Sequence, residues 1–129
     1  MVLVDFEHIY TQEQRAEKLA EKKKEFAQLL TKIPGKKKKA GRAISDQAAF
    51  LAVAIEELDK IVIRDGYVEE YQNGESQKGT KKTVAADLLD RYTKTYTTTI
   101  KQIVDLLPEE EAKTAKDEMT EFMKRRPKV

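Results

Sequence analysis

Apolar residues recur every three or four positions in two long segments of this chain, and this spacing predicts two amphipathic helices. The first helix spans residues 45–65 and the second spans residues 83–107. Ser45 and Thr83 each suit the start of a helix because their hydroxyls can accept a bond from an exposed backbone N–H. Gly66 suits a helix end, since glycine tolerates the left-handed backbone found there. The sequence therefore predicts an antiparallel helical hairpin.

Two further helices are predicted on either side of this hairpin. Thr11-Gln-Glu-Gln14 forms a capping box, so a helix begins there and continues to Ile33. Pro34-Gly35 then ends it, because proline lacks an N–H and disfavours a helical residue before it. Pro108 suits the first turn of a C-terminal helix. The apolar positions of that last helix are Ala112, Ala115, Met119, Phe122 and Met123.

A polar insert at residues 67–79 separates the two long helices. Its first half alternates weakly, and Asn73-Gly74 is the favoured centre of a tight hairpin turn in which both positions need positive φ. The return arm is polar throughout, so a loop is also compatible with it. We favour a small β-hairpin. The predicted fold is then mainly α, an antiparallel helical hairpin with additional N- and C-terminal helices and a small β-hairpin insert.

Charged residues make up 37% of the 129 residues and apolar residues 40%, which leaves a thin core that a second copy of the chain could complete. The charge is uneven: residues 1–43 hold 11 Lys and Arg against 6 Asp and Glu, whereas residues 44–129 hold 14 against 17. We expect residues 1–43 to form a basic N-terminal helix and linker. Residues 44–129 form the helical hairpin oligomerisation core with its C-terminal helix.

The segment from Lys36 to Arg42 has one alanine and no larger apolar side chain, so it is typical of a flexible basic linker. Lysines near phosphates release counterions, which gives an affinity for polyanions that falls with salt. A basic tail that only keeps the chain soluble is an equal alternative. The candidate DNA-binding residues are Lys22, Lys23, Lys24, Lys36, Lys37, Lys38, Lys39 and Arg42.

Catalytic, metal-binding and cofactor-binding motifs are not evident in the sequence. There is no cysteine, and His8 is the single histidine, without a partner to make it a general base. Five residues lie between Gly35 and Gly41 instead of the four of a phosphate loop, and no Lys-Ser/Thr pair follows. We expect no enzyme activity, no metal and no cofactor. Neither a signal peptide nor a membrane span is indicated, so a cytoplasmic protein with no membrane contact is expected.

One segment carries a family resemblance. Tyr71-Gln-Asn-Gly-Glu-Ser-Gln-Lys-Gly79, read on through Lys81, Lys82, Ala85, Ala86, Tyr92, Tyr96, Ile100 and Ile103 to Leu106-Leu107-Pro108, resembles the small subunit of tailed-phage terminases. The resemblance covers roughly residues 45–111. Lys82-Thr83-Val84 departs from it, since similar sequences often have proline just before the long helix.

This resemblance implies a non-enzymatic protein that forms ring-like homo-oligomers. Such a protein recognises double-stranded viral DNA in the host cytoplasm and hands it to the terminase large subunit, an ATPase and nuclease. The apolar positions of the second long helix are then the expected oligomer interface: Leu88, Tyr92, Tyr96, Ile100 and Ile103. The alternative is a non-enzymatic helical adaptor or structural protein that binds another protein through the same apolar hairpin.

Overall fold

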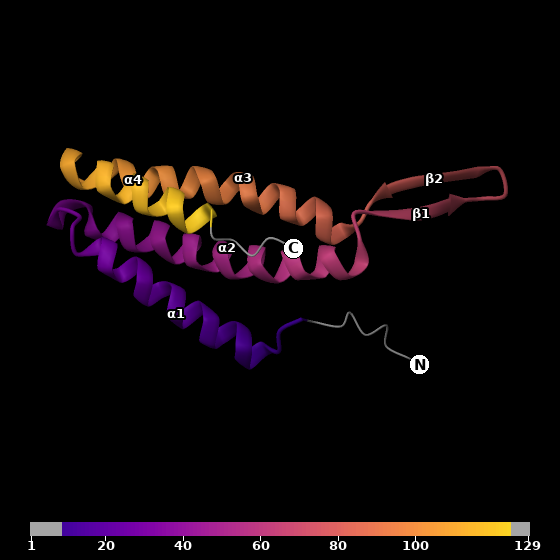
Figure 1. The fold of residues 1–129 in the computed structure, drawn as a ribbon, viewed down its shortest axis with the longest axis horizontal. Coiled ribbons are helices and arrows are strands. Elements are labelled where there is room, and N and C mark those ends of the chain that lie inside the picture. Colours follow the sequence, from indigo (N-terminus) through magenta and orange to yellow (C-terminus); the bar gives the residue numbers. More distant parts are fainter. Residues whose placement is uncertain (1–8, 125–129) are drawn as a thin grey trace.

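The computed structural model describes residues 9–124, with side chains throughout this range except at 111, 115, 118, 119 and 122–124. The fold is mainly α with a small antiparallel β-hairpin, which confirms the predicted fold class. Figure 1 shows α2 and α3 side by side as the long helical hairpin, with the β-hairpin projecting beyond one end. The elements are α1 (Gln12–Leu30), η1 (Gly35–Lys37), α2 (Lys38–Asp65), β1 (Val68–Asn73), β2 (Gln77–Lys82), α3 (Val84–Asp105) and α4 (Glu109–Lys124).

Three of the predicted helix caps are present, whereas Ser45, the expected start of the first long helix, lies inside α2, where its hydroxyl donates to the Arg42 carbonyl at 3.0 Å. The Thr11 hydroxyl accepts a hydrogen bond of 3.1 Å from the Gln14 backbone N–H, and the Gln14 side chain accepts one of 2.9 Å from the Thr11 N–H. Thr83 caps α3 by accepting a bond of 3.2 Å from the Ala86 N–H. Gly66 follows α2 with φ of 86°. These local signals set the helix boundaries because each satisfies backbone groups that the helix end leaves exposed.

The expected flexible linker is helical instead. After η1, α2 begins at Lys38, so the boundary expected after residue 43 falls inside a helix. Gly41 explains the difference: it is buried, and a Cβ placed on it would lie 2.8 Å from Cδ1 of Ile33. The absence of a side chain lets the start of α2 pack closely against the end of α1. The lysines at 36–39 are exposed, so their charges stay in contact with water and do not prevent the helix from forming.

The polar insert is a β-hairpin and not a loop, but its turn differs from the expected one. Asn73 pairs with Gln77, which leaves a three-residue connection, and within it only Gly74 has positive φ, at 76°. Asn73 therefore ends β1 and does not occupy the turn. Tyr71 lies opposite Gly79, and a Cβ on that glycine would come within 2.9 Å of the tyrosine ring. The ring covers the strand position that has no side chain of its own.

The hydrophobic core lies where α1, α2 and α3 meet. Its buried members include Tyr96, Ile100 and Ile103 of α3, packed with residues of both other helices: Phe26, Leu29, Ala48, Ala49, Leu51 and Ile55. Ile33, just after α1, and Leu107, just after α3, complete the core. α1 thus shares one core with the helical hairpin. The four threonines at 95 and 97–99 are accommodated because each hydroxyl donates to the carbonyl four residues earlier, at 2.7 to 3.2 Å.

Candidate functional site

Five basic residues follow closely on one another where α1 turns into α2, and Figure 1 shows this turn at the end of the molecule opposite the β-hairpin. We call Lys36, Lys37, Lys38, Lys39 and Arg42 the basic tip. All five are exposed, and none forms an ion pair with any other described residue. The buried Gly41 anchors this turn to the core, so the charges are held on a fixed element and not on a flexible linker.

The basic tip also coincides with the positive end of a long helix dipole. α2 has 28 residues and spans roughly 42 Å. Its N-cap, Lys37, makes no side-chain capping bond, and its first turn holds no acidic residue. Cations at a helix N-terminus are unfavourable, whereas phosphate groups are favoured there by the helix dipole. The local electrostatics therefore suit a bound polyanion.

The three remaining candidate lysines lie elsewhere. Lys22, Lys23 and Lys24 are in the middle of α1, and the helix continues for roughly 9 Å beyond Lys24 before it ends. Lys22 forms an ion pair of 3.2 Å with Glu25, while Lys23 and Lys24 are exposed. The structure brings five of the eight predicted DNA-binding residues together and leaves these three apart.

An apolar groove of about 380 Å³ lies between α1 and α3, with residues of α2 between them. Leu88 and Tyr92 of α3 line it, as do Ala16 and Leu19 of α1. Phe50 also lines the groove and is 54% exposed. Its other α2 residues are Val53, Ala54, Leu58 and Ile61. A groove lined mainly by apolar side chains is the type of surface at which proteins associate.

The five residues expected at an oligomer interface divide into two groups. Tyr96, Ile100 and Ile103 are 4%, 7% and 1% exposed and pack in the core of the single chain. Leu88 and Tyr92 are half-buried and line the groove. The α2 residues of the groove, above all Phe50, were not predicted as interface residues. The signal for them is the width of the apolar face of α2, which exceeds what one neighbouring helix covers.

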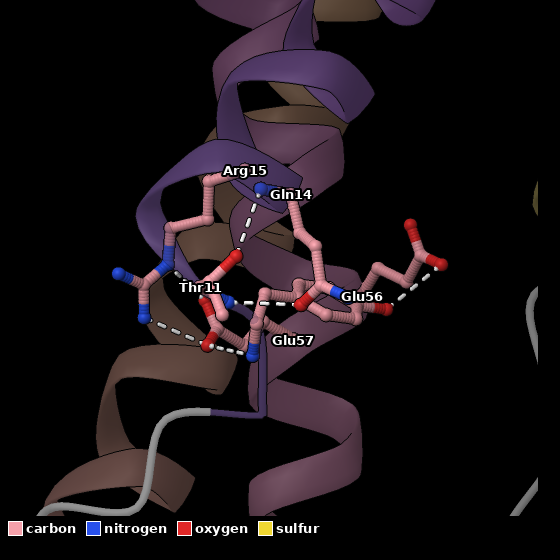
Figure 2. Close-up of polar contacts among 6 residues, drawn as sticks. Thr11, Gln14, Arg15, Glu56 and Glu57 are labelled. Carbon is pink, nitrogen blue, oxygen red and sulfur yellow. Dashed lines mark hydrogen bonds and ion pairs between the residues drawn. The ribbon is translucent and has the colours of Figure 1, made fainter.

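A polar cluster fixes the start of α1 to α2 at the rim of the groove (Figure 2). The Arg15 guanidinium donates two hydrogen bonds to the Glu57 carboxylate, at 2.7 and 2.8 Å. The Tyr10 N–H donates to the same carboxylate at 3.1 Å, and the Tyr10 hydroxyl donates to Glu56 at 3.0 Å. Lys18 forms an ion pair of 3.4 Å with Glu56. Glu57 is buried, so these bonds compensate for its desolvation.

The same contacts shift two pKa values. Burial, reinforced by the hydrogen bond to Glu56, raises the pKa of the Tyr10 hydroxyl well above its ordinary value. The hydrogen bonds to Glu57 raise the pKa of Arg15. Both shifts keep the Tyr10 hydroxyl and the Arg15 guanidinium protonated, so both groups donate hydrogen bonds that hold α1 against α2. A nucleophile or general base would need to lose its proton.

The described residues offer no metal centre, since no three of their His, Cys, Asp or Glu side chains come together in a suitable arrangement. His8 lies outside these residues. No helix in the part of the chain that the structure describes is both long and apolar enough to cross a membrane. No family model, curated protein or solved structure matches the chain.

Proposed function

We propose that this chain is a terminase small subunit: a non-enzymatic homo-oligomer that binds double-stranded viral DNA and delivers it to the large ATPase and nuclease subunit in the host cytoplasm. The basic tip is the DNA-contacting surface of each copy. The apolar groove is the surface through which copies associate. In this proposal the large subunit alone carries out the catalysis.

The observation that carries this proposal is the uncompensated charge at the basic tip. Five exposed cations stand at the positive end of α2 without an acidic neighbour in its first turn, and no ion pair with a described residue offsets them. A DNA backbone would neutralise the side-chain charges and the dipole together. A tail that only confers solubility needs no fixed position, whereas here Gly41 holds the charges against the core.

One basic tip can contact only a short stretch of DNA, so the proposed function requires several copies to associate. Five cations reach only a few phosphates, and sequence-independent binding of this kind is weak at physiological salt. Several tips on one oligomer would bind the same duplex with a higher effective concentration. The groove supplies the apolar surface for such an oligomer, since Phe50 remains more than half exposed in one chain.

Fluorescence anisotropy with a labelled DNA duplex tests the proposal. The variant with Lys36, Lys37, Lys38 and Lys39 changed to Gln should lose most of the affinity seen for the wild type at low salt. The matched control changes Lys60, Arg64, Arg91 and Lys94 to Gln, which are exposed and lie toward the β-hairpin end of α2 and α3. It alters the net charge by the same amount and should retain more affinity. Equal losses in both variants would contradict a DNA site at the tip.

The groove also supports a second candidate function, that of a helical adaptor. A groove with helices on both sides can accept the apolar face of an amphipathic helix from another protein. The adaptor would be a monomer in solution and would show no salt-dependent retention on DNA. Light scattering on the purified chain, together with the anisotropy titration, separates the two functions.

A further inference from the structure

The β-hairpin is exposed along both strands and has two unpaired edges. Its sheet contains only β1 and β2, and eleven of their twelve residues are exposed, with Gly79 half-buried. The base of the hairpin is tied to the helices: the Thr83 N–H donates to the Tyr67 carbonyl at 3.0 Å, and the Thr83 hydroxyl donates to the Gly66 carbonyl at 3.2 Å. The hairpin therefore projects in a defined direction (Figure 1). Isolated two-stranded sheets are marginal, and free edges are templates for further pairing.

The two edges carry opposite charge. β1 contains Glu69 and Glu70 and no basic residue, whereas β2 contains Lys78, Lys81 and Lys82 and no acidic residue. Each edge is therefore lined by charges of a single sign.

The pairing register leaves most of this charge without a partner. Glu69 lies opposite Lys81 and forms an ion pair of 3.6 Å. Glu70 lies opposite Thr80, Lys82 opposite Val68 and Lys78 opposite Gln72, and these three charged side chains form no ion pair with the other described residues.

These charges decide which edges of two copies can meet. Pairing β1 with β1 of a second copy places acid beside acid, and pairing β2 with β2 places lysine beside lysine; like charges opposite each other are destabilising in a sheet. Pairing β2 with β1 of the next copy places opposite charges together. When neighbouring copies have similar orientations, β2 of one copy runs antiparallel to β1 of the next, just as it runs antiparallel to β1 of its own hairpin.

We propose that the hairpins of neighbouring copies join edge to edge, the basic strand β2 of one copy pairing with the acidic strand β1 of the next. This inference rests on the homo-oligomer of the proposed function and names a second contact for it, separate from the groove. The contact is head-to-tail, so it repeats from copy to copy and closes into a ring when the rotation permits. It would also cover Val68 and Tyr67, which are 62% and 69% exposed beside the hairpin base.

The location of the hairpin is compatible with DNA binding. The hairpin and the basic tip lie at opposite ends of α2 (Figure 1), separated by a helix of roughly 42 Å. Strand pairing between copies therefore leaves every tip accessible. It also holds the tips on the same side of the assembly.

Charge reversal on one strand at a time tests this pairing. One variant carries Glu69→Lys and Glu70→Lys, and a second carries Lys78→Glu, Lys81→Glu and Lys82→Glu. In each, both edges have the same sign, so self-association measured by sedimentation equilibrium should weaken roughly ten-fold or more. An equimolar mixture of the two should regain the lost affinity, because each basic edge again meets an acidic one.

Matched controls separate this effect from a change of net charge or of folding. Glu17→Lys with Glu21→Lys changes the charge as the first variant does, on exposed positions of α1, and should associate as the wild type does. Circular dichroism should show unchanged helix content in all variants, since the replaced side chains are exposed. Each single-strand variant also places like charges opposite each other within its own hairpin, as at the Glu69 and Lys81 pair. Recovery of affinity in the mixture checks this effect, because a hairpin that had melted would not regain it.

The outcomes distinguish the inference from the proposed function. Unaltered association of both single-strand variants, or a mixture that remains as weak as its components, would overturn the strand pairing while leaving the oligomer intact. A wild-type chain that is monomeric at every concentration would overturn both. DNA binding by the basic tip, measured on the same samples, reports separately on the proposed function.

Discussion

Gly41 of α2 faces Ile33 so closely that a Cβ on the glycine would lie 2.8 Å from the Ile33 Cδ1, and 3.2 Å from Cδ2 of Leu30. This approach is what lets α2 start directly after the turn and hold the basic tip in place. Gly41→Leu should overpack the junction and lower the free energy of unfolding by roughly 1–3 kcal/mol. Urea denaturation measures the loss. Ala40→Leu, one residue earlier and exposed, should change it by less than about 0.5 kcal/mol.

Arg15 and Glu57 should be coupled in stability. Arg15→Met leaves the buried Glu57 carboxylate without its strongest donor, at a cost of about 2 kcal/mol, because an unpaired buried charge is poorly solvated. The double variant Arg15→Met with Glu57→Leu removes the charge as well and should be less destabilised than Arg15→Met. A double-mutant cycle by urea denaturation gives the coupling. Additive losses would mean that the pair contributes nothing beyond its separate side chains.

Tyr10 should make the stability fall at high pH. The pKa of its hydroxyl is raised by burial and by the hydrogen bond to Glu56, so the folded chain keeps this proton above pH 10, where the unfolded chain loses it. The stabilisation is complete below pH 10 and is lost progressively as the pH rises above it. Tyr10→Phe should cost about 1 kcal/mol at pH 8 and show a weaker decline between pH 8 and 11. Parallel declines in both proteins would assign the effect to other groups.

The helix boundaries that the sequence predicts well are those set by local chemistry. Thr11 and Gln14 cap α1 through bonds between residues three apart, and Thr83 caps α3 in the same way. The start of α2 depends instead on the fit of Gly41 against Ile33, across the turn. A run of lysines carries no apolar spacing that could indicate this fit. The sequence alone therefore does not predict that α2 begins at Lys38; the tertiary contact between Gly41 and Ile33 determines it.

The candidate site likewise has features that the sequence predicts and features that depend on how the chain packs. The residues of the basic tip are adjacent in sequence, so their clustering was predictable, but Lys22, Lys23 and Lys24 share only their charge with them and lie along α1. An apolar stripe predicts that Ile100 and Ile103 are buried without saying which helix buries them. Here it is α2 of the same chain, and the apolar groove lies farther along the same stripe of α3, at Leu88 and Tyr92.

The two groups of lysines should differ in their effect on the salt dependence of DNA binding. Each lost phosphate contact reduces the slope of log K against log salt by about 0.9. The Gln variant of Lys36 to Lys39 should therefore flatten this slope by several units if every lysine meets a phosphate, whereas the Gln variant of Lys22 to Lys24 should change it by less than about one. Anisotropy titrations at several salt concentrations give both slopes. A larger change in the second variant would move the DNA site to α1.

Phe50 should decide whether copies of the chain associate through the groove. It is 54% exposed, so Phe50→Asp leaves the core intact while placing a charge in an apolar surface, and the mass measured by light scattering should fall toward that of the monomer. Ile63→Asp is the matched control, because Ile63 is 45% exposed on the same helix and does not line the groove. If Ile63→Asp dissociates the oligomer and Phe50→Asp does not, the contact between copies lies on the other face of α2. If neither does, the apolar surface of α2 is not the contact, and the groove is open to a partner helix instead.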